Sequence, residues 1–145
     1  MSKVIAVCQS EEKGIPKDNI KQGFFEVSHG LKGDAHAGDW HRQVSLLAIE
    51  SIDKMRETGL TLNPGDFAEN LTTEGVVLQN LPVGTRLKVG SHVILEVTQI
   101  GKKCHKGCAI YQKTGDCIMP REGIFARVLN PGIIKEEDDI EIMDE

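Results

Sequence analysis

Residues 85–100 read TRLKVGSHVILEVTQI and contain the clearest structural pattern of the chain. Val93, Leu95 and Val97 occupy every second position, which is the period of a strand that buries one face. The shorter run at 85–90 alternates in the same way, and a Gly-Ser pair lies between the two runs. Two alternating runs joined by so short a connection predict a β-hairpin.

Other short apolar runs surround this hairpin and are separated by glycine and proline. Residues 48–57 have apolar side chains at helical spacing and are followed by Gly59, so they predict a helix that ends there. Residues 70–75 lead into a further apolar run at 76–81. Strands are predicted at 3–8, 23–27, 42–47, 85–90, 92–100 and 133–142, with 123–129 as a strand or a short helix.

These elements favour one fold class. About seven short strands with frequent turns are typical of a barrel or a sandwich. The chain of 145 residues has the size of one domain, so we expect a single domain over 1–145. Aromatic residues make up only 4%, and a core of valine, isoleucine and leucine also favours β-structure.

Charge and hydropathy exclude some classes of protein. The net charge of −5 is concentrated at the C-terminal end, and the chain lacks the basic face of a nucleic-acid-binding protein. No apolar stretch reaches the roughly 20 residues of a membrane-spanning helix, and the first residues do not resemble a secretory signal. The expected location is the cytoplasm, where cysteines stay reduced and serve chemistry, metal binding or redox sensing.

Three of the four cysteines lie in residues 102–127, KKCHKGCAIYQKTGDCIMPREGIFAR. Lysines, arginines and a histidine surround Cys104, Cys108 and Cys117, and nearby cations stabilise the reactive thiolate. These thiols are therefore candidates for nucleophilic chemistry, sulfur transfer or metal binding. Two alternatives stay open: the cysteines pack as small apolar residues, or they bind zinc together with His105. Cys8, at the end of the first predicted strand, is interpreted as a core thiol.

A glycine-rich loop at 29–42 is a second candidate region, because long loops within a compact domain are usually functional or disordered. It carries Asp34, His36, His41 and Arg42. The histidines are better explained by hydrogen bonds within an ordered loop than by metal binding, and Asp34 is expected to bond the loop backbone.

Anion binding is the chemistry expected of Arg42, Asn70 and Arg121. Guanidinium groups present a planar set of donors to phosphate and oxyanions, and an amide adds one more donor. In the alternative interpretation Arg42 pairs with Glu69 or Asp66 and only joins two loops, and Arg121 is a surface residue.

Five segments in chain order resemble the MOSC domain, the C-terminal domain type of molybdenum cofactor sulfurases. The resemblance covers nearly the whole chain and implies a closed or partly open β-barrel of short, mostly antiparallel strands with one or two short helices, similar to the pyruvate kinase barrel. The segments are GDAHAGDWHRQVSLL (33–47), GDFAENLTTEG (65–75), LPVGTRLKVG (81–90), LEVTQIGKKCHKGC (95–108) and GDCIMPREGIFARVL (115–129).

The resemblance also implies a function in sulfur or molybdenum-cofactor chemistry. Domains of this type are thought to receive sulfur on a cysteine from a pyridoxal-phosphate-dependent cysteine desulfurase, and related domains ligate molybdenum through the matching cysteine. Cys108 matches best and would carry sulfur or ligate molybdenum or tungsten. Cys104 and Cys117 would assist it. Partners would be the desulfurase or proteins that mature molybdenum enzymes.

The resemblance places Arg42 and Asn70 at the cofactor- or anion-binding end of the domain. Arg42, Asn70 and His41 would line a pocket for an oxyanion or phosphate, and Asp34 and His36 would shape its loop. The chain lacks the N-terminal barrel domain of relatives that hold the complete molybdopterin, which favours a smaller ligand or a persulfide. Two alternatives stay open: a non-catalytic module for an oxyanion or pterin phosphate, and a domain stabilised by zinc.

Overall fold

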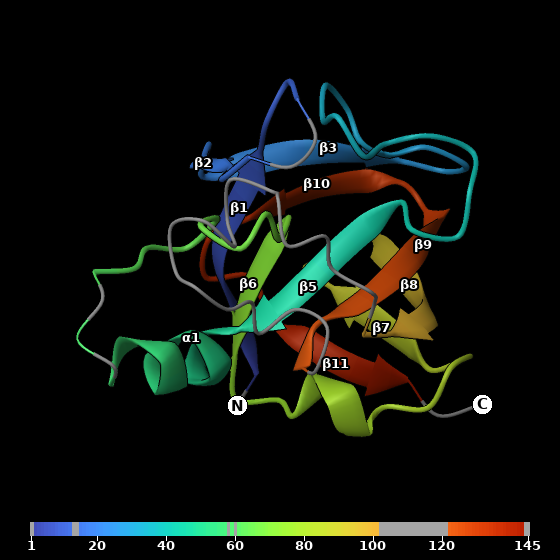
Figure 1. The fold of residues 1–145 in the computed structure, drawn as a ribbon. Coiled ribbons are helices and arrows are strands. Elements are labelled where there is room, and N and C mark those ends of the chain that lie inside the picture. Colours follow the sequence, from blue (N-terminus) through green and yellow to red (C-terminus); the bar gives the residue numbers. More distant parts are fainter. Residues whose placement is uncertain (1, 13–14, 58, 60, 102–121, 144–145) are drawn as a thin grey trace.

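The computed structural model describes residues 2–12, 15–57, 59, 61–101 and 122–143. The candidate residues Cys104, Cys108, Cys117 and Arg121 lie outside these ranges. Figure 1 shows strands that wrap around a common centre, with one α-helix at the side. The elements are β1 (Lys3–Gln9), β2 (Asp18–Asn19), β3 (Gln22–Glu26), β4 (Gly30–Leu31), β5 (Val44–Ala48), α1 (Ile49–Arg56), β6 (Leu71–Glu74), η1 (Leu78–Asn80), β7 (Arg86–Val89), β8 (Val93–Ile100), β9 (Ile124–Asn130), β10 (Gly132–Lys135) and β11 (Ile140–Met143).

The larger sheet has the strand order β11-β7-β8-β9-β5-β6-β1-β2, and a second sheet has the order β10-β3-β4. All pairs are antiparallel except β5 with β6. The larger sheet curls until its ends approach each other, because Lys3 in β1 forms an isolated bridge with Asp139, just before β11. The mainly β, partly open barrel expected from the sequence is therefore confirmed.

The predicted hairpin is formed by β7 and β8, with Val89 opposite Val93. The alternation seen in the sequence corresponds to burial, since Val93, Leu95 and Val97 are all buried. Beyond the hairpin, β8 pairs along its length with β9, so residues 124–130 form a strand and not a helix.

Two segments differ from the sequence prediction. Residues 133–142 contain two strands in different sheets, because a turn in which Lys135 N donates to Asp138 Oδ2 (2.9 Å) separates β10 from β11. The strand β6 lies before the apolar run at 76–81, which instead contains η1.

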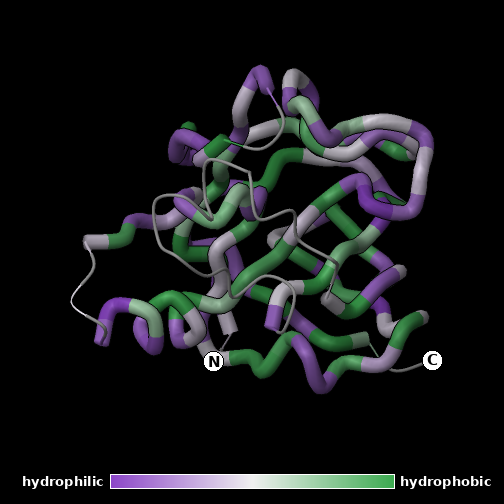
Figure 2. The backbone as a smooth tube through the Cα atoms, viewed as in Figure 1, coloured by the Kyte–Doolittle hydropathy of each residue, from purple (hydrophilic) through white to green (hydrophobic). Residues whose placement is uncertain are grey.

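Hydrophobic residues follow the strands and hydrophilic residues concentrate in the turns, as Figure 2 shows. The main core fills the barrel, and a smaller core lies under α1, where Ile52 and Met55 pack with Leu47, Phe67 and Phe125. The helix ends near its predicted position, with Gly59 N bonded to Arg56 O (3.0 Å) and a positive φ at Gly59. Among the described residues, no helix is long and apolar enough to cross a membrane.

Candidate functional site

Arg42 lies at the end of the glycine-rich loop, just before β5. Its guanidinium carbon is 4.6 Å from the centre of the Trp40 ring and 5.7 Å from the centre of the Phe125 ring. The Nε atom is buried without a hydrogen-bond partner, and no hydrogen bond or ion pair joins Arg42 to any other described residue. The alternative in which Arg42 pairs with Glu69 or Asp66 is therefore not seen in the described part of the chain.

This environment makes Arg42 suited to bind an anion. Two aromatic faces stabilise the cation but satisfy none of its N–H donors. A buried donor without a partner costs free energy, roughly 1–3 kcal/mol. An oxyanion would remove that cost, because the guanidinium donors match two oxygens of such a group.

The described residues on both sides of the cysteine segment lie close to this arginine. Gly101 N donates to Gly123 O (2.7 Å), so the two ends of the segment at 102–122 are held together. Phe125, which contacts Arg42, follows Gly123 by two positions. On the other side, Gln99 Oε1 lies 2.9 Å from Nε2 of His41, the neighbour of Arg42. The chain therefore enters and leaves the cysteine segment beside Arg42.

A buried ion pair orders the first half of the loop. Asp34 Oδ1 accepts from Lys17 Nζ (2.7 Å) and from Ser10 N (3.1 Å), and the side chains of Lys17 and Asp34 are fully buried. Asp34 Oδ2 accepts from His36 N (3.1 Å), which is the expected bond of an aspartate to its own loop backbone. Asp34 thus joins the end of β1 to the loop.

Lys17 is a residue that sequence reasoning missed. It lies in a polar turn, IPKD, where a lysine is normally exposed, and no local pattern marks it as buried. Burial lowers the pKa of Lys17, although the hydrogen bond and charge of Asp34 act in the opposite direction. Burial alone would raise the pKa of Asp34, but the hydrogen bond and charge of Lys17 outweigh it and hold that pKa below its usual value.

Trp40 connects this network to Arg42. Its indole Nε1 donates to His36 O (2.8 Å), and the face of its ring contacts the Arg42 guanidinium. The loop therefore runs from the Lys17–Asp34 pair through His36 and Trp40 to the candidate anion-binding arginine. The sequence identified the loop and four of its residues but gave Trp40 no role.

Asn70 lies in the interior, fully buried, immediately before β6. Its Oδ1 accepts from Ser45 N (3.0 Å) and Ser45 Oγ (3.1 Å), and its Nδ2 donates to Cys8 O (3.1 Å). The amide also lowers the pKa of Asp34, which places it next to the buried ion pair. Asn70 therefore links β1, β5 and the loop, and its role toward a ligand stays a prediction.

Cys8 is a core thiol, as predicted. Burial raises the pKa of Cys8, and the nearby charge of Glu69 raises it further. A thiol held neutral in this way is a poor nucleophile. Cys8 is thus not a candidate for sulfur transfer.

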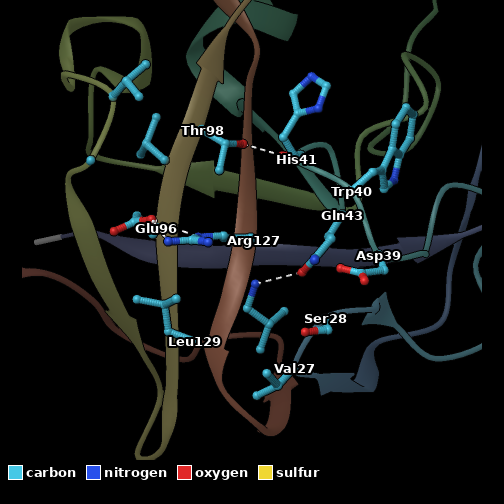
Figure 3. Close-up of a pocket in the computed structure, with 14 residues that line it drawn as sticks. Val27, Ser28, Asp39, Trp40, His41, Gln43, Glu96, Thr98, Arg127 and Leu129 are labelled. Carbon is cyan, nitrogen blue, oxygen red and sulfur yellow. Dashed lines mark hydrogen bonds and ion pairs between the residues drawn. The ribbon is translucent and has the colours of Figure 1, made fainter.

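His41 lies next to Trp40, and the centres of the two rings are 5.8 Å apart. It lines a cavity of about 540 Å³ between the loop and strands β8 and β9, together with Gln43 and Arg127 (Figure 3). Its carbonyl accepts a hydrogen bond from Thr98 Oγ1. Arg42 is not among the described residues that line this cavity, but Trp40, whose ring contacts Arg42, is. The structure therefore brings Asp34, His36 and Asn70 together, and the ring of Trp40 contacts both His41 and Arg42.

Metal binding has no candidate within the described ranges, where no cluster of three or more cysteine, histidine or acidic side chains occurs. The zinc alternative rests on Cys104, His105, Cys108 and Cys117, which lie outside these ranges. It stays a prediction, as do the roles given to Arg121 and to the three cysteines.

Comparisons with known proteins agree with the fold and the motifs. The family model of the MOSC domain matches residues 33–141. No curated protein matches the sequence significantly. Among solved structures, the YuaD protein from Bacillus subtilis superposes with a TM-score of 0.79 at 19% identity, over 98% of this chain and 96% of that one. YiiM from Geobacillus stearothermophilus gives 0.76 at 16% identity, over 99% and 76%. YiiM from Escherichia coli gives 0.71 at 20% identity, over 100% and 71%.

Proposed function

This chain belongs to the MOSC domain family, which is generally linked to molybdenum-cofactor-related function, and from that premise we propose that it handles a small sulfur or oxyanion species. Arg42 binds the negative charge of the ligand. Cys108 carries sulfur or ligates a molybdenum or tungsten species, assisted by Cys104 and Cys117. Activity depends on a partner that supplies sulfur, for which a pyridoxal-phosphate-dependent cysteine desulfurase is the proposed donor.

The observation that carries this proposal is the environment of Arg42. The guanidinium is held between Trp40 and Phe125 and has no hydrogen bond or ion pair among the described residues. An arginine that only stabilises the fold would be expected to bond a carboxylate or a carbonyl group. The position of Phe125, two residues after Gly123, adds that the chain leaves the cysteine segment beside this group.

The proposed ligands fit this donor set. Molybdate and tungstate are compact oxyanions, and a persulfide is anionic when deprotonated, so each would use the guanidinium donors. A bound molybdenum or tungsten centre would supply the redox or sulfur-accepting chemistry. The residues of this chain would orient the anion and hold a thiolate next to it.

Transfer of sulfur from the desulfurase to Cys108 needs no further oxidant. The Cys108 thiolate attacks the outer sulfur of the desulfurase persulfide, so a new S–S bond forms on Cys108 and the desulfurase leaves as a thiolate. A second thiolate, Cys104 or Cys117, then attacks Cys108 sulfur, forms a disulfide and releases hydrosulfide. Transfer of the outer sulfur to an acceptor nucleophile is the alternative outcome of the same intermediate.

Calorimetric titration of molybdate and tungstate tests the role of Arg42. We expect Arg42→Ala to weaken binding at least about tenfold, since a charge-assisted bidentate contact is worth more than about 1.4 kcal/mol. Arg127→Ala is the matched control, because Arg127 is an exposed arginine already paired with Glu96 (2.6 Å). Affinity that survives Arg42→Ala but falls in Arg127→Ala would contradict the proposal.

The same titration separates the two functional alternatives. Replacement of Cys104, Cys108 and Cys117 by serine should weaken binding if a thiolate contributes to the site. Unchanged affinity in this triple variant would favour a non-catalytic module for an oxyanion or pterin phosphate. Metal analysis of the freshly purified protein tests the zinc alternative, for which one bound zinc per chain is the expected result.

A further inference from the structure

The cavity of about 540 Å³ beside the glycine-rich loop has a size that suits a small molecule. Pockets for small organic ligands usually have volumes of roughly 300–1,000 Å³ and combine apolar walls with a few polar groups. The apolar part of this cavity comes from Val27, Val83 and Leu129, together with the ring of Trp40. Val27 and Val83 are exposed, so an apolar ligand would remove their surface from water.

Gln43 is a buried polar side chain of this cavity, with only 3% of its surface exposed. The backbone N–H of Val128 donates to Gln43 Oε1 (2.9 Å), as the dashed line in Figure 3 shows. Because only an acceptor can face that N–H, the orientation of the amide is fixed, and Nε2 is the other atom of the group. No hydrogen bond joins Nε2 to another residue in the described part of the chain, so its N–H donors are available to a ligand.

Asp39 supplies a negative charge to the same cavity. It is exposed, and it forms no ion pair with any residue that the structure describes. The other two charged groups of the lining neutralise each other, since Arg127 Nη2 lies 2.6 Å from Glu96 Oε1. The carboxylate of Asp39 therefore gives the cavity an uncompensated negative charge, which attracts a cation.

Hydrogen bonds between the loop and β8 hold the walls of the cavity in place. Nε2 of His41 lies 2.9 Å from Gln99 Oε1, and Thr98 Oγ1 donates to His41 O. The main chain of Gln43 is also packed closely, because a Cβ on Gly30 would collide with Gln43 O. A ligand therefore meets groups that are already in position, which lowers the entropic cost of binding.

We propose that this cavity binds a small organic amine that carries a hydroxyl or carbonyl oxygen near its ammonium group. Asp39 binds the ammonium group, and Gln43 Nε2 donates to the oxygen. The apolar part of the molecule packs against Val27 and Val83. This site goes beyond the function proposed above and does not depend on it, because Arg42 is not among the described residues that line the cavity.

Titration with three related probes tests the proposal, with NMR of the ¹⁵N-labelled protein at pH 7 as the measurement. L-phenylalaninol carries an ammonium group and a hydroxyl group, phenethylamine lacks the hydroxyl group, and N-acetyl-phenylalaninol lacks the charge. We expect L-phenylalaninol to shift the side-chain amide signal of Gln43 and to bind at least about threefold more tightly than phenethylamine, because it makes one more hydrogen bond. The N-acetyl compound should bind most weakly.

Two variants test the two polar groups separately. Asp39→Asn removes the charge at an exposed position and should weaken the binding of both amines at least about threefold. Asp18→Asn is the matched control, because Asp18 is an exposed aspartate in β2, outside the cavity, and its affinities should not change. In Gln43→Met the advantage of L-phenylalaninol over phenethylamine should disappear. This advantage is a ratio within one protein, so a lower stability of the variant does not alter it.

Three results would overturn the proposal. Equal affinity for L-phenylalaninol and its N-acetyl derivative, or unchanged affinity in Asp39→Asn, would exclude the carboxylate as the group that binds the amine. An advantage of L-phenylalaninol that persists in Gln43→Met would exclude the amide as the donor. If Gln43→Met does not fold, the unmodified protein decides, because a Gln43 side-chain signal that does not shift at millimolar L-phenylalaninol excludes the site.

Discussion

Glu69 is a buried acidic residue whose two carboxylate oxygens differ in their hydrogen-bond partners. Glu69 is fully buried, with Oε2 bonded to Gly65 N (3.0 Å) and Thr72 Oγ1 (2.7 Å), while Oε1 has no partner among the described residues. Burial raises the pKa of Glu69, although these hydrogen bonds act against the shift. The folded protein therefore retains a proton on this carboxyl that the unfolded chain releases.

Replacement of Glu69 by glutamine should make stability less dependent on pH. The contribution of a raised carboxyl pKa is fully present below the unfolded value of 4.5 and is lost as pH rises through the folded value. We therefore expect the stability of Glu69→Gln, relative to the unmodified protein, to rise between pH 5 and pH 8. Urea unfolding at pH 5 and pH 8 measures this difference.

The control for this prediction is Glu74→Gln, since Glu74 is half exposed in the same strand, β6. It should change stability by no more than about 0.5 kcal/mol at either pH. A stability gain for Glu69→Gln that is the same at both pH values would show that the carboxyl is not titrating between the folded and unfolded states.

The aromatic support of Arg42 is testable by changing Trp40 alone. Trp40→Phe keeps an aromatic face toward the guanidinium but loses the bond from Nε1 to His36 O, whereas Trp40→Leu loses both. We expect molybdate affinity to decrease more in the leucine variant, by a further factor of about three to ten. Equal affinities would mean that the cation–π contact does not position Arg42.

The elements that the sequence predicted correctly are those with a clear periodic pattern of apolar residues. The β7–β8 hairpin and the helix α1 have clear periods, and both lie within a few residues of their predicted positions. Strand β6 was not recognised, because it is short and is specified by pairing with the distant strands β1 and β5. Lys17 was missed for the same reason, since its burial depends on Asp34 and Ser10, which lie elsewhere in the chain.

The turn that contains Gly65, before β6, packs closely against Lys17, the residue before β2. Lys17 N donates to Gly65 O (2.7 Å), and a Cβ on Gly65 would lie 2.2 Å from Lys17 O. Gly65 also has a φ of +92°, which disfavours other residues. A side chain here would push apart the two segments that hold the buried ion pair.

Gly65→Ala should destabilise the protein in two ways, through the positive φ of this residue and through the clash of the new Cβ with Lys17 O. Gly84 is the matched control, because its φ is +97° but a Cβ there would meet nothing within 4 Å. We expect Gly84→Ala to cost about 1–2 kcal/mol from the positive φ. Gly65→Ala should cost at least a further 2 kcal/mol. Thermal and urea unfolding measure the loss of stability in each variant. Equal losses in the two variants would show that the segments around Gly65 and Lys17 can move apart without cost.

For the whole molecule, the barrel explains how distant segments form one region. Strands β5, β8 and β9 are neighbours in the larger sheet, so the end of the glycine-rich loop lies beside both ends of the cysteine segment. The sequence motifs predicted the fold, because the resemblance extends through most of the chain. The contacts of Trp40 with both His41 and Arg42 were not predictable, since they depend on how the loop folds before β5.

The proposal for the whole molecule is that Cys108 carries sulfur and that Arg42 binds the negative charge of the ligand. Mass spectrometry after incubation with a cysteine desulfurase, pyridoxal phosphate and cysteine, followed by thiol alkylation, tests it most directly. We expect the mass of one added sulfur on Cys108, absent in Cys108→Ser and reduced in Arg42→Ala. A chain with no added sulfur on any cysteine, under conditions in which the desulfurase itself forms its persulfide, would overturn the proposal.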